Sequence, residues 1–169
     1  ALAVSDICPI DRTSLNIPVS AFVLCIVSRA MPEKGWEEAI QTVKQARELT
    51  RRDIRLIIIG DGPEYDRLSK FADGNIQFLG FRSNIRAYFA MSDLGYLPSR
   101  FRGESYPLVL IDCLFAGRPV LASDLGEIKK MITTENGKMA GDVFQLQDWN
   151  IPIEIVASLI GKYATDETY

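Results

Sequence analysis

Two carboxylates, Glu104 and Asp112, flank a proline that is well placed to open a helix, in the pattern E-x7-D with Pro107 between them. Proline is favoured in the first turn of a helix, and the free N–H groups of that turn attract phosphate. Asp112 is the one charged residue between Pro107 and Ala116, and an unpaired buried carboxylate would cost several kcal/mol. We interpret the two acids as acceptors for ligand hydroxyls beside a phosphate site.

Two cations, Arg29 and Lys34, lie in the loop that follows the first apolar run of the chain. In a doubly wound sheet this loop neighbours the loop that contains Glu104. Cations and helix N–H groups suit phosphates, whereas carboxylates suit sugar hydroxyls. The combination predicts a ligand that is both polyhydroxylated and a diphosphate.

The same residues also have ordinary structural interpretations. The two cations can be solvated loop charges. Glu104 can form a surface salt bridge with Arg100 or Arg102, which would stabilise the fold by only about 0 to 1 kcal/mol. Asp112 can face a narrow solvent-exposed stripe or pair with Arg118.

The elements that must position these residues alternate along the chain. Short apolar runs rich in β-branched residues predict buried strands at residues 22–27, 55–60, 76–80, 93–98 and 119–123, and a weaker one near 138–143. Helical spacing predicts helices at 36–50, from Pro63, and at 84–91, 108–116, 127–132 and 151–163. We expect four aromatic side chains in the core: Phe78, Tyr88, Phe89 and Phe115. The alternation predicts an α/β fold, a Rossmann-like doubly wound parallel sheet of about six strands.

Composition narrows the possible functions. The chain has 169 residues and a formal net charge of −3, which argues against a broad nucleic-acid-binding surface. It contains no histidine, so histidine-based triads and histidine metal sites are excluded within it. Three widely spaced cysteines make neither a disulfide framework nor a zinc set. No apolar run is long enough to span a membrane and no signal-peptide pattern is present, so we expect a cytoplasmic protein.

Four stretches in their spaced order resemble the C-terminal, donor-binding domain of the family 4 glycosyltransferases, which are retaining enzymes of the GT-B fold. These stretches are SRAMPEKG at 28–35, LIIIGDGPEYDRL at 56–68, IQFLGF at 76–81, and the long run from SDLGYLP to PVLAS at 92–123. Any one of them alone would be a weak signal. The resemblance implies one half of a GT-B fold.

The resemblance also implies roles for individual residues. Arg29 and Lys34 would bind the nucleotide diphosphate, and Glu104 would act as the catalytic residue by contacting donor-sugar hydroxyls or stabilising charge at the reacting sugar. Backbone N–H groups would come from a turn and the helix start that follows it: Ser105, Tyr106, Leu108 and Val109.

The remaining implied roles concern the nucleoside. Asp112 corresponds to the family acid that binds the ribose hydroxyls. Gly80 and Phe81 fall where such enzymes hold the base, largely through backbone contacts. Asp61 and Gly62 would line the same cleft. The resemblance implies no cofactor and no metal ion, since cations and helix N–H groups neutralise the diphosphate.

The sequence departs from the family pattern at two points. The usual motif is E-x7-E, and Asp112 is one methylene shorter than the glutamate it replaces. Pro107 removes one N–H group that could face the ligand. The donor is therefore expected to bind more weakly than is typical, or in a shifted position.

We expect residues 1–20 to be a leading segment or interdomain linker and residues 21–169 to form the donor domain, without the N-terminal acceptor domain. The expected function is transfer of a sugar from a nucleotide diphosphate sugar to a glycan, lipid or other acceptor, as in polysaccharide biosynthesis. The expected partners are the donor and the protein's own N-terminal domain, with peripheral membrane association through the full-length protein and no nucleic acid. The isolated chain is expected to be inactive.

Other classes stay open. The chain can be a non-catalytic nucleotide-binding or interaction module, an alternative that the Asp112 substitution leaves open, or part of a GT-B-type nucleotide-sugar epimerase. A dinucleotide-binding dehydrogenase domain is disfavoured because no G-x-G-x-x-G follows a strand.

Overall fold

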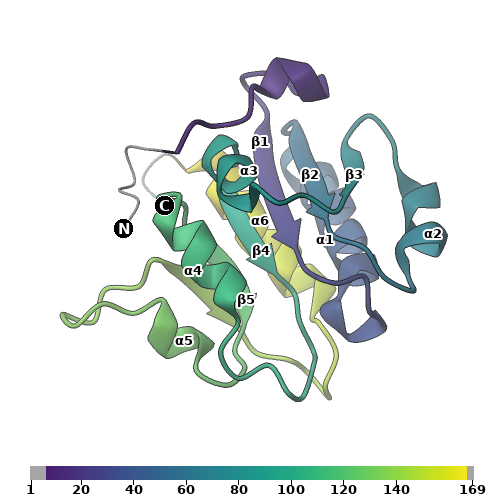
Figure 1. Ribbon diagram of the computed structural model, residues 1–169. Helices are drawn as coiled ribbons and strands as arrows, with labels where there is room; N and C mark the ends of the chain where they lie inside the picture. The colour runs from purple at the N-terminus through teal and green to yellow at the C-terminus, as the bar shows by residue number, and fades with distance from the viewer. Residues whose placement is uncertain (1–6, 167–169) are drawn as a thin grey trace.

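The computed structural model describes residues 7–166 and contains one six-stranded sheet in the order β3-β2-β1-β4-β5-β6 (Figure 1). All neighbouring strands are parallel. The strands are β1 (Phe22–Val27), β2 (Ile54–Ile59), β3 (Ile76–Gly80), β4 (Leu94–Leu97), β5 (Val120–Ser123) and β6 (Gly141–Phe144). The helices are α1 (Trp36–Thr50), α2 (Tyr65–Leu68), α3 (Ile85–Met91), α4 (Leu108–Phe115), α5 (Ile128–Met131) and α6 (Ile153–Thr165).

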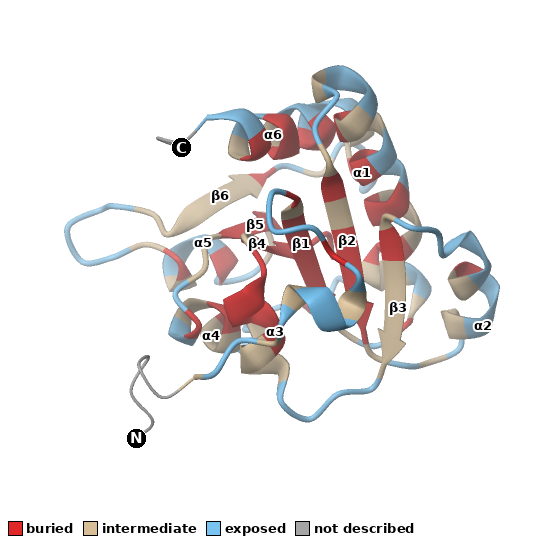
Figure 2. Ribbon diagram, turned by 90° about the horizontal axis from the view of Figure 1, so that it is seen from above, coloured by how far each residue is buried: buried red, intermediate tan, exposed pale blue. Residues whose placement is uncertain are grey.

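Helices cover both faces of the sheet, which explains why the central strands are apolar on both sides. Side chains of β1 alternate between two clusters: Leu24 and Ile26 pack with α1 and α6, whereas Val23 and Cys25 pack with α3 and α4. Figure 2 shows buried residues running along the central strands between the helical layers. The core is thus divided by the sheet into two apolar layers.

The Rossmann-like doubly wound sheet predicted from the sequence is confirmed. Strand β1 and helix α1 have the predicted bounds, and the other strands differ by at most a few residues at their ends. The helix predicted from Pro63 is instead a single turn, α2, followed by the 3-10 helix Ser69–Phe71. Three of the four aromatic side chains expected in the core do pack against it, but Phe115 is 43% exposed, because it lies on the outer side of α4.

The expected leading segment at residues 1–20 is described from residue 7, and its first six residues lie outside the described part. Residues 7–20 lie against the α3 side of the sheet, where Ile17 is buried. Arg12 makes two hydrogen bonds to the carboxylate of Asp93, at 2.9 and 3.0 Å, and that carboxylate also accepts the backbone N–H of Val23. The segment is therefore fastened to the start of β1 and β4.

Candidate functional site

The loops after β1 and β4 meet where the strand order reverses, because β1 pairs with both β2 and β4. Ligands of open parallel sheets bind at such a switch point. Gly35, between the 3-10 helix Pro32–Lys34 and α1, lies directly against the carbonyl of Pro98. A Cβ atom at Gly35 would come within 1.9 Å of that oxygen, and its φ of +71° also favours glycine. The close approach of the loops thus requires this glycine.

This contact brings together one basic residue and one acidic residue of the predicted site. Nζ of Lys34 lies 2.6 Å from Oε2 of Glu104, and the Glu104 side chain is only 9% exposed. The ammonium also lies 4.9 Å from the centre of the Phe101 ring, a distance suited to a cation–π contact. The structure therefore places Lys34 and Glu104 at one point.

The alternative partners of Glu104 are engaged elsewhere. Arg100 pairs with Glu38 at 3.0 Å, and Arg102 stacks on the ring of Trp149 at 4.4 Å. The indole N–H of Trp149 in turn donates to the carbonyl of Arg100. The two arginines thus hold the outside of the β4–α4 loop and leave the Glu104 carboxylate to Lys34.

A loop from β5 supports the Glu104 turn from the other side. The N–H of Glu127 donates to the carbonyl of Ser105 at 2.8 Å. Gly126 lies so close to Glu104 and Ser105 that a Cβ atom would come within 2.4 Å of the Glu104 carbonyl. The Ser123 hydroxyl also donates to the carbonyl of Ser99. The position of Glu104 is thus set by neighbouring strands on both sides.

An open pocket of about 530 Å³ lies at the carboxyl ends of β1, β2 and β3. Three of the predicted binding residues line it: Arg29, Asp61 and Phe81. Four residues that the sequence prediction did not select also line its polar part: Ser28, Gly60, Arg82 and Ser83. The sequence feature that could have identified them is their position, because each lies in a loop that follows a strand at this edge of the sheet.

Gly62 and Gly80 take part in the backbone of these loops and do not line the pocket itself. Gly62 has a φ of +142° and packs against the main chain of Ala30, whose N–H donates to the carbonyl of Asp61 at 2.7 Å. The carbonyl of Gly80 accepts the N–H of Gly60 at 3.0 Å. These hydrogen bonds connect the carboxyl ends of β1, β2 and β3 to one another.

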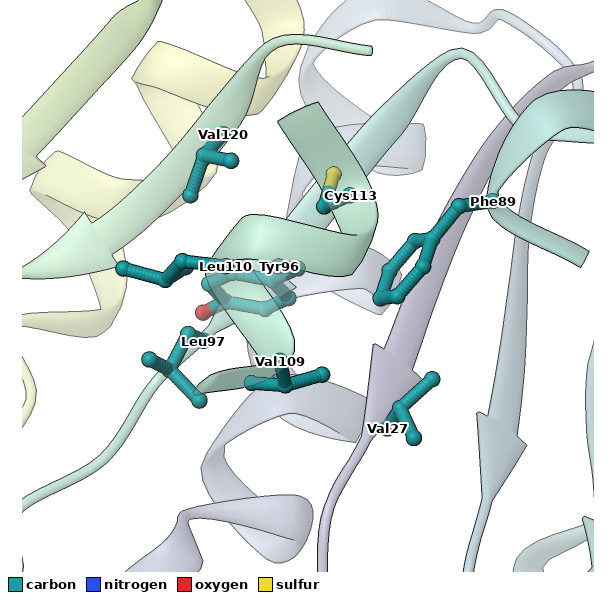
Figure 3. Close-up of a pocket in the computed structure, with 9 residues that line it drawn as sticks. Val27, Phe89, Tyr96, Leu97, Val109, Leu110, Cys113 and Val120 are labelled. Carbon is teal, nitrogen blue, oxygen red and sulfur yellow. The ribbon is translucent and has the colours of Figure 1, made fainter. Parts of the chain in front are cut away.

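Helix α4 begins at the switch point with its amino end uncapped by any side chain. The predicted backbone donors lie there, and the side chains of Tyr106 and Leu108 are exposed, at 56% and 69%. Val109 turns inward and lines a cavity of about 10 Å³ under the helix (Figure 3). A space that small is at the lower limit for a single water molecule, so α4 is packed closely onto the sheet.

Asp112 faces α3 and pairs with Arg86, with Oδ1 accepting from Nε at 2.7 Å. The expected alternative, a pair with Arg118, is wrong, because Arg118 donates instead to the carbonyl of Ala90. The guanidinium of Arg86 also lies 5.0 Å from the centre of the exposed Phe115 ring. Oδ2 of Asp112 makes no hydrogen bond within residues 7–166.

Two thiols, Cys113 of α4 and Cys25 of β1, are buried between α4 and the sheet. Burial raises the pKa of Cys113 to about 12, and burial together with the nearby Cys113 raises the pKa of Cys25 in the same direction. Sγ of Cys113 packs against Gly95 in β4, where a Cβ atom would come within 2.4 Å of the sulfur. These thiols are therefore neutral packing groups and take no part in the pocket.

Comparison with known proteins decides the family. A family model described as glycosyl transferases group 1 matches residues 21–152. The chain belongs to this family. The match covers every residue that we place at the switch point and in the pocket.

Curated relatives of this glycosyl transferase domain are longer enzymes. The chain is 33% identical over 119 residues to alpha-D-kanosaminyltransferase of Streptomyces kanamyceticus, covering 65% of the chain and 30% of that protein. It is 30% identical over 131 residues to N-acetyl-alpha-D-glucosaminyl L-malate synthase of Bacillus anthracis, covering 72% of the chain and 33% of the relative. The chain thus spans about a third of the length of these relatives.

Solved structures show the same fold. WaaG, a glycosyltransferase involved in lipopolysaccharide biosynthesis, aligns with a TM-score of 0.76 at 22% identity, over 93% of this chain and 41% of WaaG. HepE of Anabaena, in complex with UDP and glucose, aligns with a TM-score of 0.72 at 20% identity, over 99% of this chain and 47% of HepE. The domain therefore has the Rossmann-like fold of these GT-B neighbours.

Proposed function

We propose that this domain binds the nucleotide diphosphate sugar donor of a retaining glycosyltransferase. The observation that carries the proposal is the contact between Lys34 and Glu104 at the switch point; Arg29, in the same loop as Lys34, lines the open pocket. It unites a phosphate-binding cation and a sugar-binding acid at the start of α4. The structures of HepE with UDP and glucose and of TarM with UDP support a donor of this class.

In the proposed complex the diphosphate lies between Arg29, Lys34 and the amino end of α4. The backbone around Ser105, Tyr106, Leu108 and Val109 supplies N–H groups to the phosphates and the sugar. Oδ2 of Asp112 accepts a ribose hydroxyl, and the base lies against Gly80 and Phe81. Asp61 lines the pocket between these groups, and Gly62 holds the backbone of that wall.

The proposed reaction breaks the bond between the anomeric carbon and the diphosphate oxygen, and the diphosphate leaves with the electron pair. An acceptor hydroxyl forms the new bond on the same face of the sugar and passes its proton to the oxygen of the leaving diphosphate. Glu104 contacts the sugar hydroxyls or stabilises positive charge that develops on the sugar. Arg29, Lys34 and helix N–H groups stabilise the leaving diphosphate, so the proposal includes no metal ion or other cofactor.

The acceptor site belongs to a further, N-terminal domain in this proposal. No helix within residues 7–166 is both long and apolar enough to cross a bilayer. We place the full-length enzyme in the cytoplasm, with peripheral membrane contact through parts outside this domain. The acceptor class, a glycan or a lipid, accords with relatives such as the lipopolysaccharide 1,2-N-acetylglucosaminetransferase of Salmonella typhimurium.

Calorimetric titration of the chain tests the proposal. UDP, GDP and ADP and their sugar conjugates are titrated into the wild-type chain and the Arg29→Ala variant. At least one ligand should bind, and Arg29→Ala should weaken it at least about tenfold. Absence of binding by every ligand would overturn the proposed function. Sugar transfer by this chain alone would overturn the assignment of the acceptor site to another domain.

A further inference from the structure

Phe81 and Arg82 form the outer wall of the pocket, directly after the edge strand β3. The Phe81 side chain is 70% exposed although it lines a pocket of about 530 Å³. An apolar ring kept open to solvent beside a pocket is suited to a flat ligand group, because every nucleobase offers a π face for stacking. The exposure of Phe81 thus points to the base end of a nucleotide.

The guanidinium of Arg82 is held in place by two hydrogen bonds on different nitrogens. Nε donates to the hydroxyl of Tyr88 at 3.1 Å, and Nη1 donates to the carbonyl of Phe81 at 2.8 Å. Tyr88 is only 8% exposed, so one of the two anchors belongs to the core. Nη2 makes no hydrogen bond within residues 7–166. A guanidinium has five N–H donors and no acceptor, so three donors remain for a ligand.

One of these bonds occupies part of an acceptor in this wall. The Phe81 carbonyl already accepts from Arg82, which leaves one of its two lone pairs for an N–H group of a base. The wall beside the Phe81 ring therefore presents mainly donors. Such a wall matches a base edge that carries carbonyl oxygens and mismatches an edge that carries an amino group.

We infer that Phe81 and Arg82 form a nucleobase subsite that stacks the base on the Phe81 ring and reads carbonyl oxygens with the Arg82 guanidinium. The donor nucleotide is then of the uridine or guanosine diphosphate class. Arginine pairs well with O6 and N7 of guanine, and uracil offers two carbonyl oxygens. The amino groups of adenine and cytosine would face donors and lose their hydrogen bonds. The inference rests on the proposed function, since it names the donor class of the same pocket.

One residue of the pocket could support the opposite preference. The Asp61 carboxylate lines the same space and makes no hydrogen bond or ion pair within the described residues. A carboxylate accepts hydrogen bonds and would favour an amino group. Asp61 follows β2, closer to Arg29 than the edge strand, so we assign it to the phosphate and ribose end and test the assignment directly.

The test compares the binding of UDP, GDP, ADP and CDP to the chain by calorimetry. UDP or GDP should bind at least about tenfold more tightly than both ADP and CDP. Arg82→Gln should reduce this preference to about threefold or less, because the amide offers an acceptor as well as a donor. Phe81→Leu should weaken all four ligands by a similar factor of about five or more, because stacking is insensitive to base identity. Arg47→Gln, on the far side of the sheet in α1, is the matched control and should leave all four affinities unchanged.

The outcomes separate the two proposals. If none of the four diphosphates binds, the proposed function itself fails. If all four bind wild type within about threefold of each other, or if the preference survives Arg82→Gln, the base subsite is wrong while the donor function stands. Tighter binding of ADP or CDP that is lost in Asp61→Asn would likewise overturn it, and would assign base reading to Asp61. Arg82→Lys, which keeps the charge but not the planar fork, serves if Arg82→Gln folds poorly.

Discussion

The ammonium of Lys34 lies 2.6 Å from the carboxylate of Glu104, although 70 residues separate them in the chain. The contact joins the loop after β1 to the loop after β4, at the point where the sheet reverses its strand order. A cation already paired with the acid of the site can serve two partners when a diphosphate enters. We therefore expect the pair to contribute to the stability of the fold and, in the proposed function, to donor binding.

Removing Lys34 should destabilise the fold. Lys34→Met leaves the Glu104 carboxylate, 9% exposed, without its cation, and breaking a buried pair costs about 3 to 5 kcal/mol. Because Lys34 itself is 19% exposed, we expect a loss of about 2 kcal/mol, measured by urea unfolding. The double variant Lys34→Met/Glu104→Gln should recover at least half of that loss. Equal stability of the single and double variants would show that the pair has no net effect.

Arg29 should matter for binding and not for stability. Its side chain makes no hydrogen bond or ion pair within residues 7–166, so Arg29→Ala should change the free energy of unfolding by no more than about 0.5 kcal/mol. The affinities for the best nucleotide diphosphate and for inorganic pyrophosphate should both fall about tenfold or more. A loss of stability without a loss of pyrophosphate binding would place Arg29 in a structural role.

Substitution of Asp112 should weaken binding of the nucleoside part of the ligand and leave binding of the phosphates unchanged. Asp112→Ala should weaken the best nucleotide diphosphate about fivefold or more, because a ribose hydroxyl loses its acceptor. Binding of inorganic pyrophosphate, which lacks the ribose, should be unchanged. Asp112→Glu restores the family spacing and should bind as tightly as wild type or more tightly. An equal loss for both ligands in Asp112→Ala would refute the ribose assignment.

Gly35 should resist substitution because two loops meet on it. Gly35→Ala combines a φ of +71° with a Cβ atom 1.9 Å from the Pro98 carbonyl. Left-handed backbone alone costs an alanine about 1 to 2 kcal/mol, and the clash adds to it, so we expect more than about 2 kcal/mol of destabilisation by urea unfolding. Gly74→Ala is the matched control, since nothing lies within 4 Å of its Cβ position and its φ is not positive. It should stay within about 0.5 kcal/mol of wild type.

Alkaline pH should destabilise the fold partly through Cys113. Burial raises its pKa from 9.0 in the unfolded chain to about 12 in the folded one. Below pH 9 the thiol is neutral in both states and its contribution is complete. Between pH 9 and pH 12 the unfolded chain releases the proton while the folded chain keeps it, so stability falls by up to about 1.4 kcal/mol per pH unit for this group.

Urea midpoints of wild type and Cys113→Ser between about pH 8 and pH 10 measure this effect. Serine replaces the S–H donor with an O–H donor but does not titrate in this range, so the wild type should lose stability more steeply than the variant. Tyr96, whose pKa is also raised by burial, is present in both proteins and cancels in the comparison. Cys25 cancels only in part, because its pKa is raised chiefly by burial and also by Cys113. Parallel pH dependences would contradict a raised pKa for Cys113.

The sequence by itself determined the architecture and the family. Apolar runs such as residues 22–27 and 54–59, separated by amphipathic helices, can bury their side chains only in a parallel sheet covered on both faces. This information is local, because it depends on periodicity within each element and on turn residues between them. The same applies to the placement of Arg29, Asp61 and Phe81 at strand ends, which follows from the general position of ligands in such sheets.

Only the tertiary structure decided which charged groups meet. The pairs Lys34 with Glu104 and Asp112 with Arg86 join residues 70 and 26 positions apart, and each depends on the strand order and on how neighbouring helices and loops approach. The tertiary structure also decided how Arg82 is held. Its hydrogen bond to the Tyr88 hydroxyl fixes the guanidinium in place, whereas the sequence shows only a charged residue in a loop. The groups that a long side chain contacts depend on how elements distant in the sequence pack together, and a local sequence pattern does not encode that geometry.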